Sequence, residues 1–220
     1  MALSAAVEAF YAGTIAPLAG DGRPSAIAKR RVAGPVALGP LGLAGDEQAD
    51  RVRHGGADQA LQLYPSGHYA RLAGCFPEAA AVLVPGRLGE NLSADIEEDA
   101  VCIGDVFALG TARLQVSRPR KPCWKIDVRC GTEGVAARIA EAGWTGWYFR
   151  VLQPGQAVAG DALHLLERAA DPLTLAELHA VLAAHRPPLA DLHRIVRQPA
   201  LAGGYREQIA QRLDWLQRNP

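Results

Sequence analysis

The residues with the clearest chemical potential form a basic loop around one cysteine. The segment Ser117-Arg118-Pro119-Arg120-Lys121-Pro122-Cys123-Trp124-Lys125 surrounds Cys123 with four cations. Positive neighbours lower the pKa of a thiol and favour the thiolate, which is both a nucleophile and a soft metal ligand. Pro119 and Pro122 restrict the backbone, so the loop should hold the thiol in place. The pattern favours a reactive or metal-binding cysteine over a buried cysteine beside a solvated basic turn.

Two glycine-containing segments add polar groups that could meet the same ligand. His54 precedes Gly55-Gly56, where the backbone can turn tightly or approach a ligand closely. Asn91, in Gly89-Glu90-Asn91-Leu92, offers two donors and one carbonyl acceptor. Each motif by itself is also typical of an ordinary turn, so only their combination indicates a site.

Short strand-like runs separated by glycine and proline must position these residues. Residues 112–117 alternate apolar and polar side chains, which predicts a strand with one buried face. Thr132 could cap a helix that buries Val135 and Ile139. Further strands are expected at residues 26–32, 60–64, 106–109, 147–152 and 162–166, and a short helix at 67–73. Many short strands with few helices predict a mainly β domain over residues 1–168, a barrel or sandwich with inserted short helices.

The last segment, residues 169–220, has a different composition. Leucines recur at helical spacing in residues 173–184, and Pro187-Pro188 interrupts the pattern. It resumes in residues 189–196 and again after Gly203-Gly204. We therefore expect a small C-terminal domain of three helices.

Composition narrows the classes of partner. The 220 residues contain 23 Lys+Arg and 23 Asp+Glu, so no global field attracts nucleic acid or a membrane surface, and a small-molecule partner is expected. No C-x-x-C pair occurs, and no apolar run is long enough to span a membrane. The first 22 residues lack Lys and Arg, unlike a secretory signal, so we expect a cytoplasmic protein with free thiols. We interpret Cys75, Cys102 and Cys130 as structural.

Several motifs in a fixed order resemble those of the MOSC domain family, which is named for the C-terminal part of molybdenum cofactor sulfurases. They are Gly42-Leu43-x-Gly45-Asp46, His54-Gly55-Gly56, Gly89-Glu90-Asn91-Leu92, Gly104-Asp105-Val106-Phe107 and Pro119-Arg120-x-Pro122-Cys123. The resemblance covers residues 25–167. Tyr64-Pro65, the run 147–151 and the helical tail extend it to the stand-alone bacterial YiiM-type members.

The resemblance implies a MOSC-type β-barrel that holds a pterin-based molybdenum cofactor. In cofactor-binding members a cysteine thiolate ligates molybdenum beside the pterin dithiolene, and Cys123 occupies the matching position. Lys29 is similar to a lysine of YiiM-type sequences and is a candidate partner for the cofactor phosphate. The further cofactor-binding candidates are Arg51, His54, Asn91, Arg118 and Arg120. Asp46 would either orient one of these cations or hold its loop.

The implied activity is that of a molybdoenzyme oxidoreductase, independent of pyridoxal phosphate, which reduces N-hydroxylated compounds such as N-hydroxylaminopurines to amines. Cys123, His54 and Asn91 would be its catalytic residues. His54 could deliver a proton to the departing oxygen, because the pKa of histidine lies near working pH. Since no flavin or iron–sulfur motif is visible, electrons should come from a separate reductase of the flavoprotein type.

Two other interpretations of Cys123 stay open. A sulfur-carrier or cofactor-handling protein would use it as a persulfide site, and a Cys–His hydrolase would pair it with His54 as base. The C-terminal helices could bind the reductase, mediate formation of a homodimer or simply cover the barrel.

Overall fold

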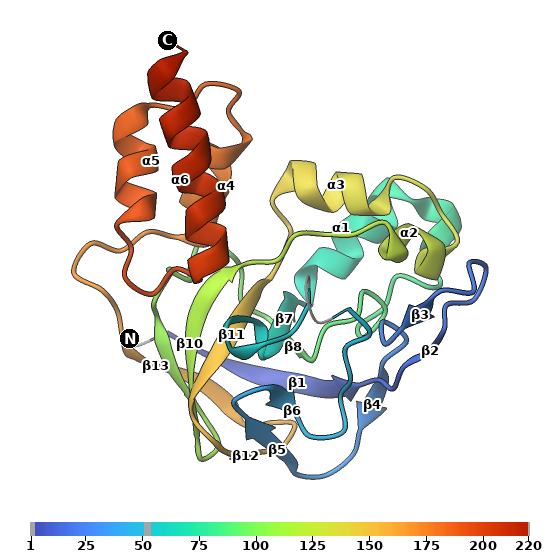
Figure 1. The fold of residues 1–220 in the computed structure, drawn as a ribbon. Helices are drawn as coiled ribbons and strands as arrows, with labels where there is room; N and C mark the ends of the chain where they lie inside the picture. The colour runs from blue at the N-terminus through green and yellow to red at the C-terminus, as the bar shows by residue number, and fades with distance from the viewer. Residues whose placement is uncertain (1–2, 51–53, 220) are drawn as a thin grey trace.

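The computed structural model describes residues 3–50 and 54–219. Figure 1 shows a barrel with two groups of helices: α4, α5 and α6 stand together at one end, and α1, α2 and α3 gather beside them. The chain end lies at the tip of α6, away from the barrel.

Seven strands close the barrel in the order β13-β9-β10-β11-β7-β8-β1, and β1 pairs back to β13. β7 and β8 run parallel, whereas the other neighbouring pairs of the barrel run antiparallel. β4 (Arg30–Val32) extends the sheet by pairing with the end of β1. The barrel strands are β1 (Ser4–Ala12), β7 (Leu61–Pro65), β8 (Leu92–Ala94), β9 (Val106–Leu109), β10 (Ala112–Pro119), β11 (Trp147–Gln153) and β13 (Ala162–Glu167).

The apolar alternation of the sequence fills the barrel. Ala112, Leu114 and Val116 of β10 are buried, as the period-two pattern predicted. Phe149 packs edge-on against Phe107 and Trp147, with ring centroids 6.0 and 6.1 Å apart. Side chains therefore fill the barrel interior, and a ligand must bind outside it.

Insertions between the strands build a wall on one side of the barrel. A second hydrophobic cluster lies under these insertions, with Tyr64, Tyr69, Leu72 and Ile126 among its buried members. The inserted helices are α1 (Gly67–Cys75), α2 (Lys125–Cys130) and α3 (Val135–Ala142), with 3-10 turns η1 (Ala57–Gln59) and η2 (Pro77–Ala79). The short strands are β2 (Ala16–Pro17), β3 (Pro24–Ser25), β5 (Val36–Gly39), β6 (Gly42–Leu43) and β12 (Gly155–Ala157).

The three C-terminal helices occur where the leucine spacing placed them. They are α4 (Leu175–Ala183), α5 (Leu189–Val196) and α6 (Gly203–Arg218). Thr174 and Glu177 form a reciprocal capping box at the start of α4. The buried residues of these helices belong to the same hydrophobic cluster as the barrel interior. The division into separate domains at residues 168 and 169 stays a prediction.

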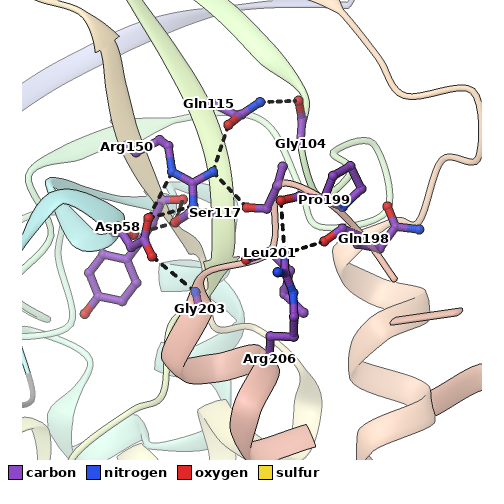
Figure 2. A network of polar contacts seen from close by, with 12 residues as sticks. Asp58, Gly104, Gln115, Ser117, Arg150, Gln198, Pro199, Leu201, Gly203 and Arg206 are labelled. Carbon is purple, nitrogen blue, oxygen red and sulfur yellow. Dashed lines mark hydrogen bonds and ion pairs between the residues drawn. The ribbon is translucent and has the colours of Figure 1, made fainter. Parts of the chain in front are cut away.

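Arg150 of β11 joins the barrel to the last helix (Figure 2). Its guanidinium binds the carboxylate of Asp58 in η1 at 2.6 Å and donates to Gln115 Oε1 at 2.8 Å and to the Ala200 carbonyl at 2.9 Å. The same Asp58 carboxylate accepts from the backbone N–H of Gly203, the first residue of α6, at 3.3 Å. The start of α6 is thereby fixed to η1.

Two local predictions were wrong. Of residues 26–32, only Arg30–Val32 form a strand. Ala26, Ile27 and Lys29 line a cavity instead. The helix after Thr132 is capped by Gly134, and Asp127 of α2 accepts hydrogen bonds from the N–H groups of Gly134 and Ala136 at 3.0 and 2.7 Å. A carboxylate from a neighbouring helix thus replaces the local hydroxyl. The sequence pattern did not predict the strand β1, because its apolar side chains are mixed with alanines.

Candidate cofactor site

One cavity outside the barrel collects most of the site residues that the sequence predicted. Lys29, His54, Asn91, Arg120 and Cys123 all line it. Its volume is about 670 Å³, including its solvent-open part. The other lining residues are Ser25, Ala26, Ile27, Asp46, Glu47, Gln48, Ala49, Asp50, Gly55, Gln59, Ala60, Gln62, Gly89, Lys125 and Tyr148.

Lys29 and Asp46 form a buried ion pair in the cavity wall. Their side chains are 8% and 2% exposed. Asp46 also accepts from the Gly13 backbone N–H at 2.8 Å and from Asn91 Nδ2 at 2.9 Å. Burial lowers the pKa of Lys29, and the adjacent Asp46 carboxylate opposes part of that change. Asp46 therefore combines the two roles considered for it, because it pairs with the Lys29 cation and also fixes the backbone at Gly13 and the side chain of Asn91.

Asn91 holds the frame of the cavity. Its Oδ1 accepts from the Gln62 N–H at 3.1 Å, and its Nδ2 donates to the Tyr11 carbonyl at 3.2 Å as well as to Asp46. Because both ends of the amide have protein partners, the geometry assigns Asn91 a positioning task. Its catalytic role stays a prediction.

Arg120 is a buried cation in the same wall. Its guanidinium donates to the Leu88 carbonyl and to Gln62 Oε1, the latter at 3.4 Å. Within the described residues it forms no ion pair. Burial raises the pKa of the neighbouring Tyr148, so that phenol remains protonated at neutral pH and can donate a hydrogen bond.

Cys123 is half-buried at the cavity, between the end of β10 and the start of α2. Its carbonyl accepts from the Ile126 N–H at 3.0 Å. The next residue, Trp124, lies under the Arg23 guanidinium at 4.0 Å, and Lys125 donates to the Pro24 carbonyl at 3.2 Å. These contacts fasten the cysteine loop to the β2–β3 hairpin.

The other cysteines lie outside this cavity. Cys102 and Cys130 are buried and Cys75 is exposed, and all four thiols of the chain are free. Burial raises the pKa of Cys102 to about 11 and also raises that of Cys130. Both thiols are therefore protonated at neutral pH, and the structural role expected for them stays a prediction.

One described candidate lies away from the cavity, and another falls outside the described residues. Arg118 does not line it, and its guanidinium lies 4.4 Å from the ring centroid of Tyr205 on α6. Arg51 lies outside the described residues. Lys121, one of the four cations of the cysteine loop, is exposed to solvent.

Sequence reasoning missed Gln62 and Tyr148 as cavity residues. Gln62 is 3% exposed in β7, between the fully buried Leu61 and Leu63. The local pattern, one polar residue between two leucines, is the ordinary alternation that predicts an exposed side chain, so no signal in the sequence could have identified Gln62. Tyr148 carried no such signal, because aromatic residues are ordinary in strands.

The donor set of this cavity suits a cofactor that brings its own metal ligands. Among the described residues, no group of three or more His, Cys, Asp or Glu side chains could hold a bare metal ion. A pterin dithiolene would supply two sulfurs, so one cysteine is a sufficient protein ligand. Cys123 would provide that soft ligand, and Lys29, Arg120 and Lys125 line the same cavity with it.

The fold is a closed β-barrel, and a cavity that contains Cys123 lies outside the barrel interior. The model of the MOSC domain matches residues 50–164, and the chain belongs to this family. The family is associated with binding or sulfuration of the molybdenum cofactor, so the chain has a function associated with that cofactor.

The chain is similar to bacterial proteins over nearly its whole length. It is 40% identical over 194 residues to "Protein YiiM" of Escherichia coli (strain K12), which covers 87% of this chain and 86% of that protein. The crystal structure of YiiM from Geobacillus stearothermophilus superimposes with a TM-score of 0.81 at 31% identity, covering 95% of this chain and 99% of that one.

A longer fungal relative also matches. A protein of Gibberella moniliformis (strain M3125 / FGSC 7600) named "Reductase" is 34% identical over 177 residues, which are 80% of this chain and 31% of that protein. These comparisons identify the chain as a YiiM-type MOSC protein.

No helix among the described residues has the length and apolarity needed to cross a bilayer.

Proposed function

We propose that the chain is a molybdenum-cofactor-dependent reductase that converts N-hydroxylated compounds, such as N-hydroxylaminopurines, to amines. The observation that carries this proposal is the position of Cys123, which lines one cavity together with Lys29, Arg120, His54 and Asn91. A fungal relative named "Reductase" supports the reaction class.

The reaction consumes two electrons and two protons. The N–O bond of R–NH–OH breaks, the amine R–NH₂ forms, and the oxygen leaves as water. When bound, the molybdenum cofactor supplies two-electron oxygen-transfer chemistry. The electrons come from a separate reductase, which we expect to be a flavoprotein.

The chain's own residues bind the cofactor and move the proton. Cys123 contributes a sulfur ligand through its thiolate. Lys29, held by Asp46, and Arg120, held by Leu88 and Gln62, place fixed positive charges in the wall, and such charges need little reorganisation during reaction. His54 lines the same cavity and delivers a proton to the departing oxygen.

Metal content tests this proposal. The wild type and Cys123→Ser are purified from a host that makes the molybdenum cofactor, and molybdenum per chain and reduction of N-hydroxylated purines are measured. We expect near-stoichiometric molybdenum and activity in the wild type, and the loss of both in Cys123→Ser. The matched control is Cys75→Ser, because Cys75 is exposed and outside the cavity.

Full activity of Cys123→Ser would contradict the ligand assignment. Absence of molybdenum from both proteins, despite confirmed cofactor supply, would favour the sulfur-carrier alternative. A persulfide on Cys123 would then be sought by mass spectrometry.

A further inference from the structure

A second cavity lies beside the first and differs from it in charge. Ser25 and Ile27 line both cavities. The second cavity contains two arginines, Arg87 and Arg129, and no acidic residue. Its other lining residues are Ala16, Pro17, Leu18, Ala19, Ala28, Val128, Cys130 and Gly131.

The two arginines have no carboxylate partner among the residues that the structure describes. Both side chains are partly buried, and the Nε of each is buried without a hydrogen-bond partner. Arg87 contacts the Cys130 thiol. Asp127 of α2 forms no ion pair with either arginine, and both of its oxygens accept backbone N–H groups at the start of α3.

Arg87 and Arg129 also repel each other. Burial lowers the pKa of Arg129, and the charge of Arg87 lowers it further. Two like charges that are desolvated together without a counter-ion are unfavourable. An anion between them would remove this cost, and two guanidinium groups are well suited to the oxygens of a phosphate.

The backbone holds Arg87 in place. Gly86 and Gly89 flank its loop at φ +90° and +86°, where a Cβ would lie 2.6 Å from Tyr11 and 2.7 Å from Ile27. The carbonyl of Leu88 accepts from Arg120, a residue of the first cavity. The arginine is therefore presented by a closely packed loop that touches both cavities.

Helix α2 connects the two cavities. Cys123 lies two residues before its start and Cys130 at its end. The rise over its six residues is about 9 Å, so a ligand of nucleotide size could reach both ends.

We propose that the second cavity is an oxyanion subsite, in which Arg87 and Arg129 bind the phosphate group of the ligand whose reacting part lies at Cys123. The identity of that ligand rests on the proposed function. The phosphate belongs either to a phosphorylated substrate, an N-hydroxylated purine nucleotide, or to the pterin cofactor. Both sources present the same phosphate ester to the same two guanidinium groups.

Titration with inorganic phosphate tests the subsite without using activity. Calorimetry is performed on wild type, Arg87→Gln and Arg129→Gln, each made in a host unable to synthesise the cofactor. We expect the wild type to bind phosphate and each variant to bind at least about tenfold more weakly, because each loses charge-assisted hydrogen bonds. Arg138→Gln is the matched control, an arginine of α3 that lines neither cavity.

Equal affinity in the wild type and both variants, or no binding by the wild type, would overturn the subsite. Repeating the titration on chains loaded with cofactor identifies the source. If the cofactor phosphate fills the subsite, loading abolishes phosphate binding, and Arg129→Gln retains less molybdenum.

If the substrate supplies the phosphate, loading leaves phosphate binding unchanged. The KM of Arg129→Gln then rises about tenfold for the N-hydroxylated nucleotide and stays unchanged for the free base. Loaded wild type that reduces neither compound would refute the proposed function, whereas the titration with inorganic phosphate would still decide the subsite.

Discussion

The two neighbouring cavities use buried cations in opposite ways. In the first, Lys29 is paired with Asp46, and Arg120 is held by the oxygens of Leu88 and Gln62. In the second, the positive charges of Arg87 and Arg129 repel each other, and the cavity lining contains no acidic residue. The first site is organised before any ligand arrives, whereas the second gains its missing partner only when an anion binds.

This difference matches the needs of two parts of one ligand, its reacting centre and its phosphate group. A reacting centre needs charges in fixed places, since reorganisation during the reaction adds to the barrier. A phosphate group takes no part in the reaction and needs only enough positive charge to replace its water. Predictions that alter the charge of one cavity at a time test whether the two sites differ in this way.

The largest effect is expected from breaking the buried pair of the first cavity. Asp46→Asn removes the charge that balances Lys29 while keeping the size of the side chain. We expect the free energy of unfolding to fall by about 3–5 kcal/mol, measured by urea denaturation, because an uncompensated buried charge remains.

Asp21→Asn is its control, since it breaks the exposed pair with Arg23 and should leave stability nearly unchanged. Adding Lys29→Met to Asp46→Asn should recover part of the loss. Equal effects of Asp46→Asn and Asp21→Asn would show that the first cavity is not held by its ion pair.

A smaller effect with the opposite sign is expected in the second cavity. Arg129→Gln removes one of two like charges that lack a counter-ion, so without phosphate the free energy of unfolding should be unchanged or up to about 1 kcal/mol higher. Urea denaturation in a phosphate-free buffer measures it. Destabilisation as large as that of Asp46→Asn would mean that Arg129 supports the fold rather than a ligand.

The smallest effect concerns pH. Since burial lowers the pKa of Lys29 in the folded chain, the unfolded chain holds this proton more tightly. The contribution of Lys29 to stability therefore rises with pH from its folded-state pKa up to its unfolded value of about 10.4.

Comparison of wild type with Lys29→Met isolates this contribution from the tyrosines and cysteines that titrate in the same range. The difference in unfolding free energy, wild type minus variant, should increase as the pH rises toward the unfolded-state pKa of lysine. A difference that decreases with pH would show that Asp46 outweighs the burial of Lys29.

Local patterns in the sequence predicted much of the fold. The alternation of β10 and the leucine spacing of α4, α5 and α6 report which faces are buried, so they could be read directly. The cap of α3 could not, because Asp127 reaches it from another helix. The strand expected from residue 26 begins only at Arg30, and Ala26, Ile27 and Lys29 line the first cavity instead.

The sequence alone named five residues that line the first cavity: His54, Asn91, Arg120 and Cys123 stand in the ordered motifs, and Lys29 came from the resemblance to YiiM-type sequences. Only the tertiary structure decided which charges are balanced, because ion pairing and burial depend on contacts between distant segments. Asp46 meets Lys29 across 17 positions of the chain. Arg87 comes to the second cavity from a loop and Arg129 from helix α2, and neither has such a partner among the described residues. That contrast, which no local pattern encodes, assigns the two cavities their different tasks.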